Sequence, residues 1–286
     1  MNKVTIFDTT LRDGSQAEGM AFSVNDKLHI LKILDDLGVS FIEAGNPFFN
    51  PKETEFFKAC QNIVLKNATL VAFCSTRRKD TACEMDEGLN AALSANTDAV
   101  SIFGKCWDMQ VSEILNVSNE ENLQMIYESI SYLKESGKYI IFDAEHFFDG
   151  YKSNKDYAMD TLRIAQKAGA DVLCLCDTNG GCFTYEIEKI VACVSKKFPD
   201  ISIGIHCHND IGCAVSNSIA AVLAGAVHVQ GTYLGFGERC GNANLSTIIP
   251  SLQLKLGYEC INSDKISSIT NAANSIAEIL NTSVKK

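Results

Sequence analysis

Apolar residues gather along the chain in short runs that recur at regular spacing, and each run is followed by a stretch with helical periodicity. Eight of these runs are rich in β-branched, aromatic or cysteine residues, which is typical of buried strands. We therefore predict eight strands, at residues 4–7, 41–44, 70–74, 99–103, 139–142, 172–176, 202–205 and 228–231.

The segments between the runs carry apolar residues at three- and four-residue spacings and end in glycine, as in 25–38 and 156–169. The unit of helix, glycine, short link and strand recurs in DDLGVSFIEAG, QKAGADVLCLC and VLAGAVHVQG. Eight such alternations in about 260 residues, with no GxGxxG after the first strand, predict an α/β fold of the closed (β/α)8 TIM-barrel type. Residues 263–280 read as an extra C-terminal helix, so we expect a barrel over 1–260 and a helical extension over 261–286.

Composition and charge narrow the class of protein. The formal net charge is −10 and no run of lysine and arginine occurs, which argues against nucleic acid or an anionic membrane as partner. No apolar stretch approaches the roughly 20 residues of a spanning helix, and the first residues do not form a signal peptide. The 12 cysteines are scattered singly without a CxxC pair, which indicates reduced thiols and a cytoplasmic protein.

Polar and ionisable side chains crowd the positions where the predicted strands end, which is where barrel enzymes carry their chemistry. The opposite ends of the predicted strands show mainly glycine-terminated helix ends. The polar set, in chain order, is Arg12, Asp13, Glu43, the stretch 75–78, Lys105, Asp143, Glu145, His146, Asp177, Thr178, Asn179, His206, His208, Asn209, Asp210 and the loop 235–242.

The motif IGIHCHND, at residues 203–210, is the clearest indication of a metal site in the sequence. Side chains alternate along a strand, so His206 and His208 project from one face about 7 Å apart while Cys207 points the other way. An isolated pair of this kind is as often two ordinary strand histidines. Here only five histidines exist and two stand together on the polar rim, which favours a shared Mg²⁺, Mn²⁺, Fe²⁺ or Zn²⁺ ion.

Asp13 is the candidate carboxylate ligand, because the first and seventh strands point at the same barrel axis. Arg12 beside it would aim a fixed cation at developing oxyanion charge, and Glu43 could hold that arginine or a metal-bound water. Asn242, in a glycine-rich loop, could supply an amide ligand. The alternatives are turn capping for Asp13 and a plain capping role for Asn242.

Five motifs, DTTLRDGSQ, FIEAGNP, DTNG, IHCHND and GERCGNANL, occur in order along nearly the whole chain. In these five motifs and their order, the chain resembles the metal-dependent TIM-barrel family that includes isopropylmalate, homocitrate and citramalate synthases and 3-hydroxy-3-methylglutaryl-CoA lyase. The segments VAFCSTRR, IFGKCWD and DAEHFFDGYK look most like the citramalate synthase branch.

The resemblance implies condensation of acetyl-CoA with a 2-keto acid, pyruvate by preference, giving (R)-citramalate and CoA for isoleucine biosynthesis. It implies a divalent metal (Mn²⁺, Mg²⁺ or Zn²⁺) on Asp13, His206, His208 and Asn242. Arg12, Glu43 and Glu145 would then be catalytic. Arg12, Asp143, His146 and Thr178 would bind substrate.

Synthases of this family continue beyond the barrel into a linker with a further histidine motif and a dimeric regulatory domain, so we expect this chain to lack that domain. A homodimer is an expectation for a barrel of this kind. Three other functions stay open. They are a 2-isopropylmalate or homocitrate synthase, a carbon–carbon lyase similar to HMG-CoA lyase, and a barrel that binds metal and keto acid without turnover.

Overall fold

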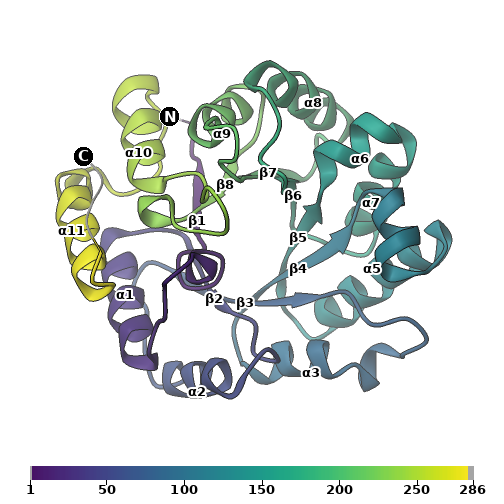
Figure 1. Cartoon of the computed structure of the whole chain (residues 1–286), viewed down its shortest axis with the longest axis horizontal. Helices are drawn as coiled ribbons and strands as arrows, with labels where there is room; N and C mark the ends of the chain where they lie inside the picture. Colours follow the sequence, from purple (N-terminus) through teal and green to yellow (C-terminus); the bar gives the residue numbers. More distant parts are fainter. Residues whose placement is uncertain (1, 283–286) are drawn as a thin grey trace.

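The eight predicted strands form one closed parallel barrel in the computed structural model, which describes residues 2–282. Each strand pairs with its neighbours in the sequence and β8 closes the barrel against β1, so the predicted (β/α)8 class is confirmed (Figure 1). The strands are β1 Thr5–Asp8, β2 Phe41–Gly45, β3 Thr69–Ser75, β4 Ala99–Lys105, β5 Tyr139–Glu145, β6 Val172–Asp177, β7 Ser202–Cys207 and β8 His228–Gly231.

Helices surround the barrel on its outside (Figure 1). They are α1 Val24–Leu37, α2 Pro51–Cys60, α3 Glu87–Ser94, α4 Asp108–Gln110, α5 Asn119–Glu135, α6 Phe147–Ser153, α7 Lys155–Lys167, α8 Thr184–Lys197, α9 Ala214–Leu223, α10 Leu245–Pro250 and α11 Ile269–Ile279. Short 3₁₀ turns lie at Gly14–Gln16, Cys83–Met85, Tyr233–Gly235 and Ser263–Ser268, and π turns at Val111–Leu115 and Ser251–Lys255.

Local sequence explains where the helices begin and end. In α1, the Ser23 side chain accepts the backbone N–H of Asp26, and the Asp26 side chain accepts that of Ser23, a reciprocal capping box. The helix ends at Gly38, whose φ of 93° is the left-handed conformation that glycine adopts without strain. The predicted glycine punctuation therefore marks a real helix end.

Alternation along each strand separates two cores. In β6, Val172, Cys174 and Cys176 belong to the small cluster inside the barrel. Leu173 and Leu175 belong to the large cluster between the strands and the helices. A strand buried on both faces in this way reads in the sequence as a continuous apolar run, which is the signal that predicts it.

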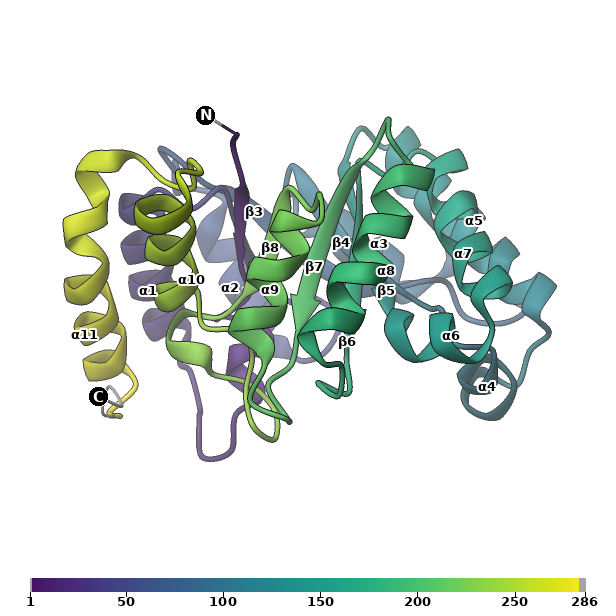
Figure 2. The same ribbon diagram turned by 90° about the horizontal axis from the view of Figure 1, so that it is seen from above.

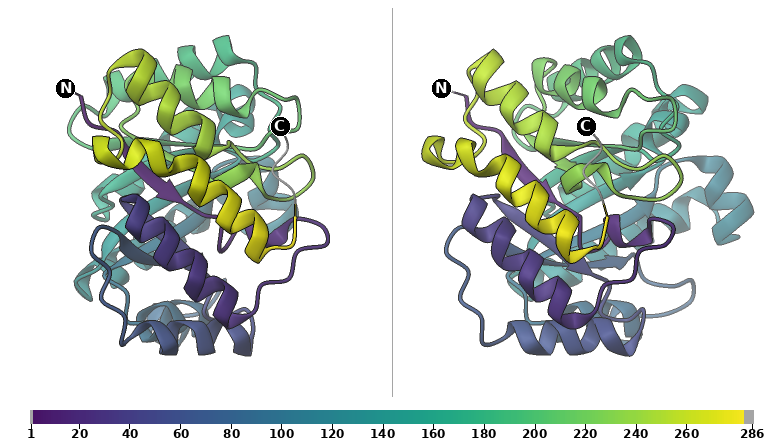
Figure 3. Two further views of the ribbon diagram at one scale, coloured as in Figure 1. Left: turned by 90° about the vertical axis from the view of Figure 1, so that its left-hand side faces the viewer. Right: turned by 60° about the vertical axis from the view of Figure 1, so that its left-hand side comes forward.

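The helix beyond the eighth unit starts later than predicted. Residues 263–268 form a 3₁₀ turn, so the α-helix begins at Ile269 and not at residue 263. The helix proper, α11, lies alongside α1, as both views of Figure 3 show. The Tyr233 hydroxyl donates to the carbonyl of Ile269 and fixes its start. Residues 283–286 of the predicted extension lie outside the described part of the chain.

All eight strands run the same way, so their carboxyl ends meet at one end of the barrel, opposite the end where the chain enters β1 (Figure 2). Polar side chains from different strands are therefore brought together on one rim. Among the described helices, none combines the length and the apolar character needed to cross a membrane.

Candidate active site

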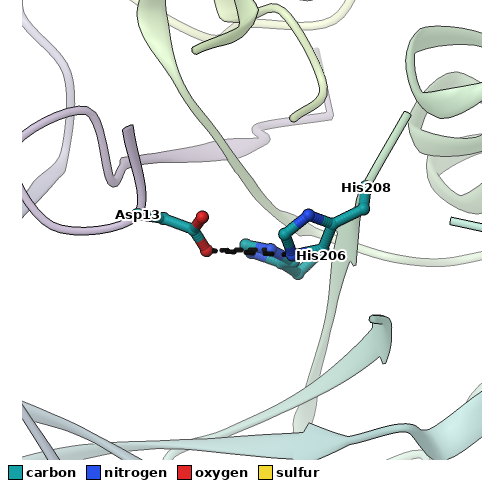
Figure 4. A group of neighbouring side chains, drawn as sticks. All are labelled: Asp13, His206 and His208. Carbon is teal, nitrogen blue, oxygen red and sulfur yellow. Dashed lines mark ion pairs between the residues drawn. The ribbon is translucent and has the colours of Figure 1, made fainter. Parts of the chain in front are cut away.

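Asp13, His206 and His208 meet at the carboxyl end of the barrel (Figure 4). Asp13 lies in the turn after β1, where its backbone N–H donates to Oγ1 of Thr9. His206 is on β7 and His208 follows that strand, with ring centroids 5.1 Å apart. Cys207 between them packs into the outer core, so the alternation predicted for HCH holds.

The spacing of these side chains suits an ion between them. Oδ2 of Asp13 is 3.5 Å from Nε2 of His206 and 3.9 Å from Nε2 of His208, longer than good hydrogen bonds. Ligand atoms about 2.1 Å from one cation lie roughly 3.0–3.5 Å apart, so the first separation is at that range and the second slightly wider. Two imidazole nitrogens and a carboxylate oxygen form a set of ligands that divalent cations bind.

Electrostatics keeps these groups in the protonation states that a cation requires. Burial lowers the pKa of His206 to about 4 and also lowers that of His208, so both imidazoles are neutral at pH 7. Burial by itself would raise the pKa of Asp13, but the charge of Arg12, together with smaller contributions from the two histidines and the hydrogen bond from Asn242, brings it down to about 2. The site therefore holds an ionised carboxylate beside two neutral nitrogen donors.

Asn242 lies next to this group because the chain segment after β7 pairs with the loop after β8 at His208 and Asn242. Its Nδ2 donates to Oδ1 of Asp13 at 2.9 Å and to the carbonyl of Phe236 at 3.1 Å. Its Oδ1 is buried and has no hydrogen-bond partner among the described residues. Coordination through that oxygen requires the amide to rotate by about 180°, which exchanges its two ends.

Arg12 is held by two carboxylates. Its Nε lies 2.6 Å from Oε2 of Glu43, and its Nη1 lies 3.2 Å from Oδ2 of Asp13. The guanidinium carbon is 4.0 Å from the ring centre of Phe73, a cation–π contact. Although burial opposes the charged form, Glu43 and Asp13 raise the pKa of Arg12, so the cation is permanent and fixed in direction.

A cavity of about 270 Å³ opens beside these groups. Of the predicted site residues, Arg12, Asp13, Asp143, Glu145, Thr178, His206 and His208 line it. Glu43, His146 and Asn242 are absent from its lining. Glu43 touches Arg12 from behind, and Asn242 touches Asp13. The backbone N–H of His146 donates to Oγ1 of Thr178, while its ring faces Asp149 and Trp107.

The structure also pairs one predicted residue with a neighbouring lysine and adds residues to the cavity that the sequence did not single out for a role. Glu145 forms an ion pair with Lys105, with 2.6 Å between Nζ and Oε2. The lining further includes Gln16, Phe73, Phe103, Cys176 and Glu238. Phe73 and Phe103 lie within predicted strand runs, where apolar residues read as core. Strand alternation alone could have placed their rings on the inner face.

A second group of metal-ligating side chains, Asp143, Cys174 and Cys176, lies inside the barrel. Both Asp143 oxygens already accept hydrogen bonds, from Ser101 at 2.5 Å and from Gln230 at 2.8 Å. Burial raises the pKa of the Cys174 thiol well above its usual value. Protonated thiols beside a carboxylate whose oxygens already accept hydrogen bonds are poor metal ligands. The group of Asp13, His206 and His208 is therefore the better candidate for a metal site.

Comparison with known proteins agrees with the motifs. The family model described as HMGL-like matches residues 3–275. The (R)-citramalate synthase of Aquifex aeolicus (strain VF5) is 52% identical over 279 residues, which are 98% of this chain and 53% of that protein. The 2-isopropylmalate synthase of Sulfolobus acidocaldarius is 35% identical over 90% of this chain and 64% of its own length. The chain thus spans about half the length of the citramalate synthases that it matches.

Among solved structures, hydroxymethylglutaryl-CoA lyase from Pseudomonas aeruginosa superposes with a TM-score of 0.82 at 19% identity, covering 100% of this chain and 95% of that one. The HMG-CoA lyase from Brucella melitensis gives a TM-score of 0.77 at 17% identity, covering 97% of this chain and 100% of that one. At these identities the likeness concerns the fold. The family model spans almost all of the barrel and the metal-ligand motifs predicted the same group, so the chain belongs to the HMGL-like family.

Proposed function

We propose that the chain carries the catalytic barrel of a metal-dependent enzyme that condenses acetyl-CoA with a 2-keto acid, pyruvate by preference, to give (R)-citramalate and CoA. The observation that carries the proposal is the convergence of Asp13, His206 and His208 with the fixed cation of Arg12 on one cavity. The similarity to (R)-citramalate synthases over nearly the whole chain supports the acceptor and the product.

Asp13, His206, His208 and Asn242 are the residues that would hold the divalent cation. When bound, the cation supplies a Lewis acid that polarises an oxygen of the keto acid. Arg12 lines the same cavity and provides a cation for the oxyanion that develops as the new carbon–carbon bond forms. Because Glu43 and Asp13 hold its guanidinium, this charge needs no reorganisation during the reaction.

Thr178 and Glu145 complete the proposed set. Oγ1 of Thr178 accepts the backbone N–H of His146, which leaves the hydroxyl hydrogen available to a substrate carboxylate. His146 therefore contributes by orienting Thr178. Glu145 faces the cavity, where we assign it the role of accepting a proton from the acetyl methyl group. Water then cleaves the thioester, so acetyl-CoA, pyruvate and water give citramalate and CoA.

The preference for pyruvate rests on the similarity to (R)-citramalate synthases, and we assign to the aromatic wall of the cavity the role of limiting the size of the acceptor side chain. The rings of Phe73 and Phe103 stack with centroids 5.2 Å apart and an interplanar angle of 15°, and both line the cavity. A methyl side chain needs little room beside this wall, whereas an isopropyl or carboxyethyl group needs more. Asp143, at the same cavity, is hydrogen-bonded at both oxygens, so we assign it to shaping the binding site.

The test is release of free CoA from acetyl-CoA, followed with a thiol reagent, with pyruvate, 2-ketoisovalerate and 2-ketoglutarate offered separately. Each reaction is run with Mn²⁺ and with a chelator, and Mn²⁺ binding is measured in parallel. His206→Ala is the test variant, and His29→Ala is its control, because His29 lies on the exposed side of α1.

We expect chelator-sensitive CoA release with pyruvate, lost in His206→Ala and retained in His29→Ala. Faster CoA release with 2-ketoisovalerate would mean that the acceptor is that of an isopropylmalate synthase and not pyruvate. Faster release with 2-ketoglutarate would mean that it is that of a homocitrate synthase. Mn²⁺ binding that depends on His206 without CoA release would reduce the function of this chain to binding. The cytoplasmic location and the homodimer stay predictions, which fractionation and sedimentation would test.

A further inference from the structure

We propose that Gln230, held by Asp143, is a positioning residue that sets which ring nitrogen of His206 carries the proton. The inference rests on the proposed metal site. The contacts form one chain: Nδ1 of His206 is 3.0 Å from Oε1 of Gln230, and Nε2 of Gln230 donates to Oδ1 of Asp143 at 2.8 Å. The Ser101 hydroxyl donates to Oδ2 of the same carboxylate.

This chain of hydrogen bonds crosses the interior of the barrel. His206 on β7 is the register partner of Gln230 on β8, whereas Asp143 comes from β5 and Ser101 from β4. Gln230 and Ser101 are completely buried. A buried amide without partners would be costly, so the two partners of Gln230 explain how this polar residue is accommodated inside the barrel.

The polarity of the amide fixes the direction of every bond in the chain. An amide has a donor end and an acceptor end, and a carboxylate only accepts. Oδ1 of Asp143 accepts the donor end of Gln230, while Oδ2 of the same group bonds to the Ser101 hydroxyl, so the acceptor end of the amide faces His206. Nδ1 of His206 must then carry the ring hydrogen, and the neutral ring keeps a lone pair on Nε2.

Nε2 of His206 is the atom that faces Asp13 in the proposed metal site. The Gln230 amide therefore selects the tautomer whose free lone pair points at the cation position. The tautomer of His208 is not selected in this way, because its Nδ1 lacks a hydrogen-bond partner among the described residues. Loss of the Gln230 amide should consequently weaken one ligand of the metal and leave the other unchanged.

The first experiment reads the tautomer without any metal. Long-range ¹H–¹⁵N NMR of the chain with ¹⁵N-labelled histidine rings distinguishes Nδ1–H from Nε2–H, and His206→Ala assigns the signal. We expect Nδ1–H in the parent chain. Gln230→Met removes the acceptor with little change of shape, so the Nε2–H form should appear. Gln230→Glu, protonated on the oxygen that faces Asp143, keeps an acceptor at His206 and should preserve Nδ1–H.

The second experiment measures Mn²⁺ affinity from the free-ion EPR signal. Gln230→Met should weaken binding about 10- to 100-fold, as loss of a partner behind a ligand histidine does, and Gln230→Glu should weaken it much less. The matched control is His228→Phe, on the same strand and also buried, but without a hydrogen bond to either ring nitrogen among the described residues. It should bind Mn²⁺ within about twofold of the parent.

An Nε2–H tautomer in the parent chain would overturn the inference, whatever the variants do. It would also be overturned if folded Gln230→Met kept the Nδ1–H tautomer or bound Mn²⁺ within twofold of the parent. If circular dichroism shows that Gln230→Met does not fold, the inference is tested by the tautomer of His206 in the parent chain and in Gln230→Glu. Failure of the parent chain to bind Mn²⁺ would contradict the proposed function instead, and it is distinguishable because the NMR experiment needs no metal.

Discussion

The Nε atom of Arg12 lies 2.6 Å from Oε2 of Glu43, an oxygen that also accepts the hydroxyl hydrogen of Thr9. Glu43 is completely buried on β2, and Arg12 is the cation that meets it. The pair therefore does two things at once. It compensates a buried carboxylate, and it points the guanidinium at the cavity beside Asp13.

Removal of the Glu43 carboxylate should destabilise the barrel, because it leaves Arg12 without its strongest partner and opens a void behind it. We expect Glu43→Ala to lower the free energy of unfolding by about 3 kcal/mol. Urea unfolding measures this, with the exposed Glu113→Ala as control, which should change it by less than about 0.5 kcal/mol. A loss below about 1 kcal/mol in Glu43→Ala would contradict the structural role.

The aromatic wall of the cavity should set the size of the acceptor. Phe103→Ala removes one ring of the lining and keeps the Phe73 ring that stacks on it and lies under Arg12. We expect kcat/KM for 2-ketoisovalerate relative to pyruvate to rise by about tenfold, in line with what a few carbon atoms decide in an apolar pocket. CoA release measures the ratio. Phe183→Ala, at an exposed ring, is the control, and an unchanged ratio in Phe103→Ala would argue against this wall.

Signals within one stretch of chain could be predicted, because they depend on neighbours in the sequence. The strands are continuous apolar runs, Gly38 ends α1 in the conformation that glycine favours, and His206 and His208 share a face by alternation. Because all strands of a closed barrel surround one axis, Asp13 after the first strand could be predicted as the carboxylate that lies near these two histidines.

Features that depend on side chains meeting across the barrel could not be predicted. Gln230 and Asp143 are 87 residues apart and touch only because their strands face the same interior. His146 follows β5 as expected, but its backbone adopts a φ of 54° and its ring turns to Asp149. No local pattern distinguishes that rotation from one that points the imidazole into the cavity.

A buried ion pair joins α1 to α2 and should be sensitive to loss of one partner. Nζ of Lys27 lies 2.7 Å from Oε1 of Glu53 and donates to the carbonyl of Ala44 at the end of β2. Lys27→Met should lower the free energy of unfolding by about 3 kcal/mol, because it leaves the Glu53 carboxylate unpaired in the interior.

The double variant Lys27→Met with Glu53→Met separates charge from packing. Replacement of both partners by apolar groups removes the unpaired charge, so it should recover most of the lost stability. Urea unfolding of the two single variants and the double variant gives the coupling energy directly. A double variant as unstable as the sum of the singles would show that the pair acts through packing alone.

His228 should make the stability of the barrel depend on pH. Its ring is buried against Phe7 and Phe41, and burial lowers its pKa to about 3 from the ordinary value of 6.5. Between these values the unfolded chain binds a proton that the folded chain does not, so stability falls as pH drops below 6.5, by at most about 1.4 kcal/mol per pH unit. His228→Phe removes this proton, so its unfolding free energy, measured in urea from pH 7 to 4, should decline less steeply than that of the parent. Parallel declines would mean that His228 titrates normally in the folded barrel.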